Sequence, residues 1–228
     1  DLKGKMMMPS FHDAHSHPIW DGINQLKCVL TDLYDLQSIK DVLRDCLESE
    51  LTKSTGWIVG SGLNIGLFPS GNPNKSILDD ISKDIPIILW ANDGHSGLAN
   101  SKALELANIT SDTKEPLYGV IERDLMTGEP SGTLRESSAI NAVLDLAPKD
   151  TDVDYDKGLS IAQDMAHSFG ITSVLEAAVG ERHMAAYKRA AEREELELRV
   201  FTCLEYGKTS FAHDASTFED VYQRLEQF

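Results

Sequence analysis

The sequence is short of cysteine, of basic residues and of long apolar runs. Its three cysteines, Cys28, Cys46 and Cys203, are too few and too scattered to predict a disulfide framework or a zinc finger, and we expect them to be reduced and buried. Against 37 acidic residues there are 21 basic ones, and the formal net charge of −16 argues against nucleic acid or an anionic membrane surface as a partner. No apolar stretch approaches the length of a membrane span and no secretory segment opens the chain, so we expect a cytoplasmic location.

What is present is an ordinary globular composition, with 41% hydrophobic and 25% charged residues in a chain of 228. This length accommodates one large domain or two small ones. The chain opens on Asp1 rather than on a methionine. We therefore expect it to be an internal piece of a longer protein.

From residue 150 onward, short apolar strands alternate with amphipathic helices. The strands are expected at 171–176 and 198–204, and the helices at about 155–169, 182–195 and 217–227. Because parallel strands need helical crossovers, this order predicts βαβ units in a doubly wound sheet or a barrel.

The first 150 residues are less regular, but glycine, proline and apolar periodicity still divide them into elements. The expected elements are a helix at 38–52, strands at 57–63 and 85–90, a loop at 91–97, a helix at 101–107 capped by Asn100, a hairpin over 118–134 turning at Gly128, and a helix at 136–146.

The stretch from Met6 to Trp20 contains the residues best suited to chemistry, because an apolar run ends there in Asp13, His15 and His17. Side chains alternate along a strand, so both imidazoles should point the same way and could bind one metal ion. Asp13 shares that face, either as an acceptor that orients an imidazole or as a solvated or capping carboxylate. A polar loop after a strand explains the bare pattern equally well, but the position at the end of a buried strand favours a metal site.

Six motifs follow one another in an order that resembles amidohydrolase family 3, the branch that includes N-substituted formamide deformylases. They are PSFHDAHSHP (9–18), WIVGSGLN (57–64), DGHSGLANSKAL (93–104), GEPSGTLRE (128–136), GITSVLEA (170–177) and LELRVF (196–201). Ser10 and His12 depart from the family pattern without changing the spacing of the two histidines. The resemblance runs over nearly the whole chain.

The resemblance implies an α/β fold in which strands 1–3 of a TIM-like (β/α)8 barrel carry a large inserted α/β subdomain between strands 1 and 2. Residues 1–54 would begin the barrel, residues 55–145 would form the subdomain covering the active-site mouth, and residues 146–228 would continue the barrel. A full barrel needs about 250 residues, so this barrel would be partial.

The family match also implies a metal-dependent hydrolase that acts on linear C–N amide bonds of small-molecule substrates. His15 and His17 would be the first two ligands of a divalent metal, zinc being the expected ion. The general-base aspartate and the remaining ligands are expected beyond residue 228, so we assign no catalytic residue within the chain and expect the isolated chain to bind metal weakly or not at all. His95 is expected to contact substrate, unless a nearby backbone group satisfies it, and Glu176 is a further candidate at the end of a strand.

Other interpretations stay open at this stage. The chain could belong to a cyclic-amide hydrolase or a deaminase of the same superfamily, or to a noncatalytic binding or regulatory protein that keeps the barrel. It could also be a complete small α/β protein in which the histidine pair merely ends a strand. Homodimerisation is compatible with the sequence, and His167 and His183 are expected on the surface or at an interface.

Overall fold

A computed structural model describes residues 2–204, which divide into two compact units that we treat separately. Unit 1 contains the described residues of 1–25 and 150–228, and unit 2 contains residues 26–149. Residues 26–54 were expected to belong to the start of the barrel, but their contacts place them in unit 2. The division of the chain into barrel and insertion stays a prediction. The expected helix at 217–227 lies outside the described residues.

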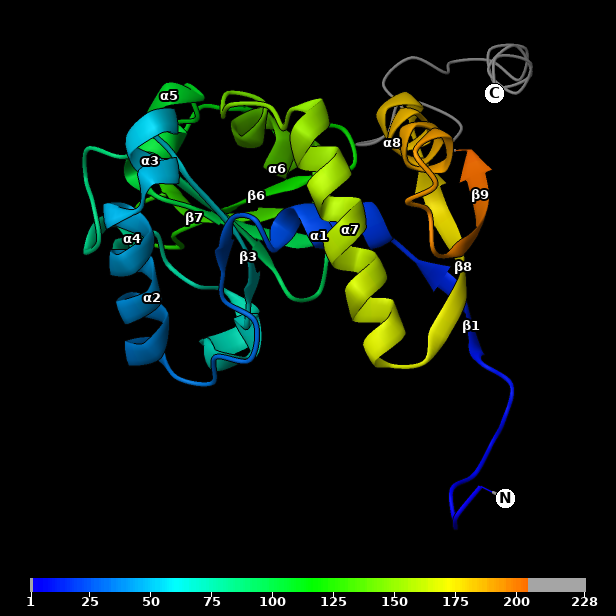
Figure 1. The fold of residues 1–228 in the computed structure, drawn as a ribbon. Helices are drawn as coiled ribbons and strands as arrows, with labels where there is room; N and C mark the ends of the chain where they lie inside the picture. The colour runs from blue at the N-terminus through cyan, green and yellow to red at the C-terminus, as the bar shows by residue number, and fades with distance from the viewer. Residues whose placement is uncertain (1, 205–228) are drawn as a thin grey trace. The chain divides into compact units, whose positions relative to one another are not determined.

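Unit 1 contains a three-stranded parallel sheet whose order is β1-β8-β9. The strands are β1 (Phe11–Ser16), β8 (Ile171–Val179) and β9 (Arg199–Leu204), and the helices are α1 (Pro18–Asn24), α7 (Asp152–Ser168) and α8 (Glu181–Glu192). Figure 1 shows the blue, yellow and orange strands side by side. The predicted parallel pairing of these three stretches is therefore confirmed.

The helices of unit 1 pack through a compact apolar cluster and one very close contact. The cluster consists of Ile19, Ile23, Leu159, Ala186, Tyr187 and Ala190. Gly22 of α1 and Gly158 of α7 lie so close that a Cβ on either would overlap the opposite helix. The start of α7 is stabilised by a capping box between Thr151 and Asp154, and Gly170 follows its end with the positive φ that a helix C-terminus favours.

Unit 2 contains a mixed six-stranded sheet in the order β2-β3-β4-β5-β7-β6. Its strands are β2 (Cys28–Val29), β3 (Ile58–Leu63), β4 (Ile87–Ala91), β5 (Ser96–Ala99), β6 (Val120–Arg123) and β7 (Pro130–Arg135). Its helices are α2 (Leu36–Glu48), α3 (Glu50–Thr55), α4 (Ser76–Asp79), α5 (Ser101–Leu106) and α6 (Glu136–Leu144), with 3₁₀ turns at Ile65–Leu67 and Pro69–Gly71. Across the described part of the chain, no helix is both long enough and apolar enough to cross a membrane.

Most elements of unit 2 lie where the sequence predicted them. The fully buried β4, the antiparallel β6–β7 hairpin with Gly128 at φ 74°, and the Asn100 cap of α5 are all confirmed. The expected helix at 38–52 is instead two helices, because Ser49 is extended and its hydroxyl caps the second helix through the N–H of Thr52. The expected loop at 91–97 ends in β5, a strand too short for its pattern to be recognised.

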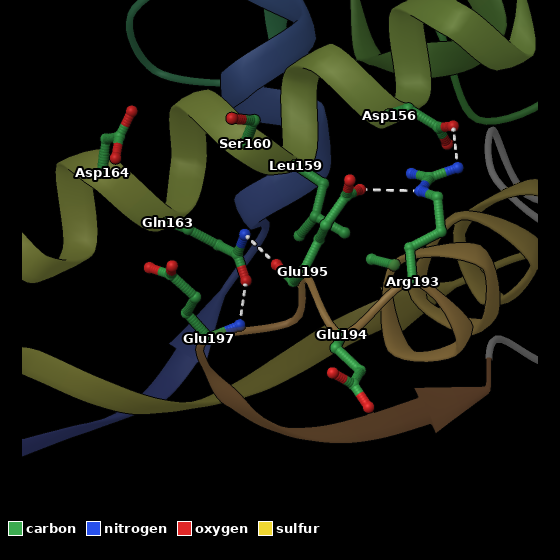
Figure 2. A pocket seen from close by; sticks show the side chains of 10 residues that line it. Asp156, Leu159, Ser160, Gln163, Asp164, Arg193, Glu194, Glu195 and Glu197 are labelled. Carbon is green, nitrogen blue, oxygen red and sulfur yellow. Dashed lines mark hydrogen bonds and ion pairs between the residues drawn. The ribbon is translucent and has the colours of Figure 1, made fainter.

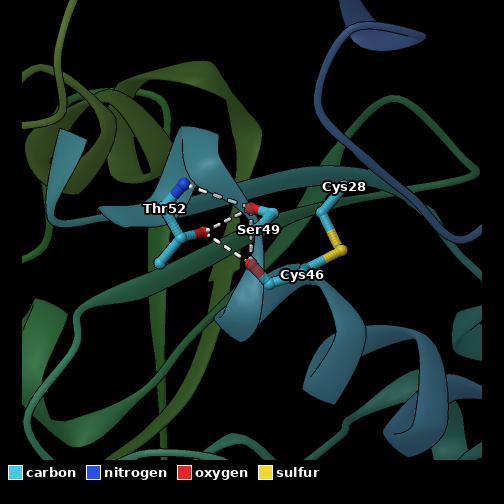
Figure 3. The surroundings of a disulfide bond; sticks show 4 residues. All are labelled: Cys28, Cys46, Ser49 and Thr52. Atoms are coloured by element: carbon cyan, nitrogen blue, oxygen red, sulfur yellow. Dashed lines mark hydrogen bonds between the residues drawn. A yellow bond between two sulfur atoms is a disulfide. The ribbon is translucent and has the colours of Figure 1, made fainter. Parts of the chain in front are cut away.

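Cys28 and Cys46 form a disulfide, which corrects the prediction that all three cysteines are reduced (Figure 3). The bond joins the edge strand β2 to the last turn of α2, where the carbonyl of Cys46 also accepts hydrogen bonds from Ser49 and Thr52. Cys203 is exposed rather than buried. The cytoplasmic location stays a prediction, and the disulfide weighs against it because cytosolic reductants keep thiols reduced.

Candidate metal-binding site

The two histidines lie where β1 ends and α1 begins. His15 is the residue before Ser16 at the end of β1, and His17 is the N-cap residue of α1, followed by Pro18 at the first helical position. Proline suits that position because its ring fixes φ near the helical value and its missing N–H has no partner to lose. The carbonyl of His17 accepts the N–H of Asp21 at 3.0 Å, so the helix anchors the backbone of the second histidine.

The rings of His15 and His17 meet edge to face, with centroids 5.4 Å apart and planes inclined by 88°. The pairing of β1 with β8 is irregular between Asp13 and Ser16, so strict alternation does not hold through this stretch. Such an irregularity can re-aim a side chain. The two imidazoles therefore lie close together, as predicted. The regular alternation of side chains along a strand does not by itself explain this, because the strand is irregular here.

Two imidazoles suit a divalent metal, but they fill only part of a coordination shell. With Zn–N distances of about 2.0–2.1 Å and tetrahedral angles, the centroids of two imidazoles on one zinc ion would lie roughly 5 Å apart, close to the 5.4 Å found here. Among residues 2–204, no group of three or more His, Cys, Asp or Glu side chains lies close enough to hold a metal ion. His15 and His17 thus fit two positions of a shell that needs further ligands.

Asp13 acts on the backbone of this stretch. Its Oδ1 accepts the N–H of His15 at 3.0 Å. This hydrogen bond matches the capping alternative considered for Asp13 and holds the chain direction just before the histidines. A carboxylate in this role limits the backbone conformations of His15.

Glu176 is fully buried on β8, opposite the residue of β1 that lies between the two histidines. It pairs with Ser16 across the β1–β8 ladder, and its Oε2 accepts the hydroxyl proton of Tyr187 from α8. Its Oε1 has no hydrogen-bond partner among the described residues. Burial raises the pKa of the Glu176 carboxyl to about 7, the Tyr187 hydrogen bond opposes this shift, and the charge of Asp21 adds to it. A role for Glu176 in the metal site stays a prediction.

His183 is buried at the start of α8, which corrects its expected place on the surface. Burial, together with the nearby charges of His17 and Arg182, lowers its pKa to about 4. Its Nδ1 accepts the N–H of Gly180 at 3.4 Å, and its ring meets that of Tyr155 edge to face. The sequence held one signal for this burial, because His183 lies four residues before Tyr187 and so shares its helix face.

In unit 2, the ring of His95 is paired with the carboxylate of Glu136. The sequence left open that a backbone group satisfies this ring, and the structure shows a side chain instead. Its Nδ1 lies 3.2 Å from Oε2 of Glu136, while its backbone N–H donates to Oδ1 of Asp93 at 3.0 Å. The ring remains 72% exposed. The sequence predicts that Glu136 opens a helix, and the structure adds that its carboxylate lies beside the His95 ring.

An arginine network fixes the strands on either side of this pair. Arg135 donates to the hydroxyl of Ser96, to the carbonyl of Gly71 and to Glu122. Asp93 accepts from both the N–H and the hydroxyl of Ser96, and although partial burial raises its pKa, these hydrogen bonds bring the pKa below its usual value. The backbone around His95 is therefore rigidly connected to the end of β7.

A separate pocket of about 390 Å³ lies between α7 and the turn that follows α8 (Figure 2). Half of its lining residues are acidic, but several of its polar groups form hydrogen bonds and ion pairs with one another. Both ends of the Gln163 amide bind the backbone of the turn at Glu195 and Glu197, and Arg193 is paired with Asp156 and Glu195. We regard this pocket as part of the packing of the turn.

The chain belongs to the amidohydrolase family, whose model matches residues 1–227. It is 30% identical over 198 residues to the N-substituted formamide deformylase of Arthrobacter pascens, covering 83% of this chain and 36% of that protein. It is 28% identical over 226 residues to the exoenzymes regulatory protein AepA of Pectobacterium carotovorum subsp. carotovorum, covering 95% and 46%. A crystal structure of an uncharacterized metal-dependent hydrolase from Pyrococcus horikoshii matches the whole chain and 40% of its own, with a TM-score of 0.62 and 24% identity.

The described residues form a mixed α/β structure with parallel strands, and the match to the solved structure shows that its fold is shared. The chain spans less than half the length of the relatives named above. The activity and substrate of the whole protein are therefore proposals.

Proposed function

We propose that this chain supplies two metal-binding histidines to a hydrolase that cleaves linear C–N bonds, with N-substituted formamides or related amides as substrates. The observation that carries the proposal is the meeting of the His15 and His17 rings at the end of a strand in a parallel sheet. In α/β enzymes such strand ends are where active sites lie. Family membership and the deformylase relative support the reaction class.

The residues of the chain have distinct parts in this proposal. His15 and His17 bind a divalent ion, with zinc as the proposed metal. Asp13 and the N-terminus of α1 hold the backbone that carries them. His95 contacts the substrate. When bound, the metal would polarise the amide carbonyl and lower the pKa of a water molecule.

The test is zinc titration of the full-length protein by calorimetry, together with hydrolysis of an N-alkylformamide. We expect His15→Ala and His17→Ala together to abolish stoichiometric binding and activity. His12→Ala is the matched control, since His12 lies on the same strand outside the histidine pair. Binding and hydrolysis that survive the double substitution would sink the ligand assignment.

The name of one relative supports a second candidate, a noncatalytic regulatory protein on the same scaffold. Both candidates bind a metal ion, and only the hydrolase uses it to cleave a bond. A full-length protein that binds zinc through His15 and His17 but hydrolyses no amide, formamide or cyclic amide would favour the regulatory candidate.

A further inference from the structure

Unit 2 contains two exposed asparagines that match the acceptor pattern for N-linked glycans. The pattern is an asparagine, any residue except proline, and then a serine or threonine, and it is typical of surface loops in secreted proteins. The first match is NKS at residues 74–76, and the second is NIT at residues 108–110. Because so short a pattern also occurs by chance, the structure around each asparagine decides whether its amide is available.

Asn108 ends helix α5 through its backbone and leaves its side chain unused. Its φ of 53° lies in the left-handed region, and its N–H donates to the carbonyl of Glu105 at 2.9 Å. The N–H of Ile109 donates to the carbonyl of Leu104 at 2.9 Å, and the Ile109 side chain is buried. These are the two hydrogen bonds and the apolar contact of a Schellman motif, in which a glycine would serve equally well. Asn108 itself is exposed, and within residues 2–204 its carboxamide makes no hydrogen bond.

The side chain of Asn74, in contrast, has a structural role. Its Oδ1 accepts the N–H of Ser76 at 3.0 Å, where α4 begins. The N–H of Lys75 donates to the carbonyl of Ser131 at 2.6 Å, so this segment is bound to β7. A Cβ on Gly132 would lie 2.6 Å from Cβ of Lys75, which shows how closely the two segments pack. Of the two asparagines, Asn108 is therefore the one whose amide is available for modification.

The disulfide of the same unit supports this interpretation independently. Cys28 and Cys46 are joined, whereas cytosolic reductants keep thiols reduced (Figure 3). Disulfides form and persist in the lumen of the secretory pathway, which is also where secreted proteins receive N-linked glycans. The disulfide and the acceptor pattern thus indicate the same compartment through unrelated chemistry.

We propose that Asn108 carries an N-linked glycan and that the chain folds in the oxidising lumen of a secretory pathway. The donor is an oligosaccharide attached to a polyprenyl diphosphate. Nδ2 of Asn108 loses a proton and bonds to the anomeric carbon, while the bond from that carbon to the diphosphate oxygen breaks and its electron pair leaves with the polyprenyl diphosphate. The hydroxyl of Thr110 completes the pattern that the transferring enzyme recognises. This proposal opposes the predicted cytoplasmic location, and it is independent of the proposed hydrolase activity.

The test uses the full-length protein isolated from the cells that normally make it. Peptide N-glycosidase in H₂¹⁸O converts a glycosylated asparagine into an aspartate that carries ¹⁸O, and mass spectrometry of the peptides locates the label. We expect the label at position 108, together with a loss of mass of the intact protein on a gel after treatment. Peptides in which Asn108 carries no glycan overturn the proposal, whether or not Asn74 is labelled.

Variants expressed in the same cells test whether the acceptor pattern is responsible. Asn108→Gln and Thr110→Ala should each lose the glycan, and the second of these keeps the asparagine in place. Thr110→Ser preserves the pattern and should keep the glycan, and Asn74→Gln should change nothing at position 108. A glycan that persists in Thr110→Ala contradicts the proposal.

The compartment is tested separately through the cysteines. Alkylation of the isolated protein before any reduction should leave Cys28 and Cys46 unlabelled and should label the exposed Cys203. Labelling of all three cysteines would show that the chain resides in a reducing compartment and would overturn the proposal.

Discussion

Gly22 and Gly158 bring the backbones of α1 and α7 into direct contact. A Cβ on Gly158 would lie 2.7 Å from a side-chain carbon of Ile23 and 2.8 Å from its backbone nitrogen. Since His17 is the N-cap residue of α1, this contact also positions the second histidine of the candidate metal site. Two glycines far apart in the sequence thus help to place the site.

The first prediction is that Gly158→Ala destabilises unit 1. The added methyl group meets backbone atoms that cannot move independently, so the cost should be at least about 2 kcal/mol of unfolding free energy, despite the better helix propensity of alanine. Urea denaturation measures the effect. Ser160→Ala, on the exposed side of the same helix, is the control and should change stability by less than about 0.5 kcal/mol. Equal stability of the two variants would show that the helices can separate at little cost.

The second prediction concerns the pH dependence contributed by Glu176. Its pKa rises from 4.5 to about 7 on folding, so the folded state holds its proton more tightly than the unfolded state does. This stabilisation is complete below pH 4.5 and is lost as the pH rises through 7, by roughly 3 kcal/mol. Glutamine cannot lose a proton, so Glu176→Gln should gain stability relative to the unchanged protein between pH 5 and pH 8. Parallel stability curves for the two proteins across this range would refute the burial argument.

The third prediction is that the Cys28–Cys46 disulfide stabilises unit 2. It closes a loop of 18 residues, which corresponds to about 3 kcal/mol in the chain-entropy model. A dithiol reductant should lower the unfolding temperature of the unchanged protein to that of the variant with Cys28→Ser and Cys46→Ser. The double variant should not respond to the reductant. Cys203→Ser, which removes the exposed free thiol, should leave the unfolding temperature unchanged in oxidising buffer.

The fourth prediction concerns Asn100, a fully buried side chain with four hydrogen bonds. Its oxygen accepts the N–H groups of Ile87 and Ala103, and its NH₂ donates to the carbonyls of Ser82 and Ile85. Asn100→Ala leaves buried backbone groups without partners, so we expect a loss of about 3 kcal/mol by chemical denaturation. Ser111→Ala, at an exposed position of the same unit, serves as the control. A loss under about 1 kcal/mol would mean that water replaces the side chain.

Local signals predicted the secondary structure of unit 1 well, because its elements are regular and separated by glycine and polar caps. Gly170 and the apolar stripe that precedes it placed α7, and the short β-branched runs placed β8 and β9. In unit 2, β5 and the two-residue β2 could not be predicted, since strands of two to four residues carry no usable period. Such strands exist because their neighbours complete their hydrogen bonds.

By itself, the sequence determined the family, the parallel order of the three strands in unit 1 and the two histidines that carry the proposed chemistry. These features depend on local periodicity and on motif order, which a linear chain retains. Only the tertiary structure decided that Cys28 meets Cys46, that Glu176 meets Tyr187, and that Glu136 reaches His95. Each of these contacts joins residues that are far apart in the sequence and come together only when strands and helices pack. A local sequence pattern carries no information about such packing.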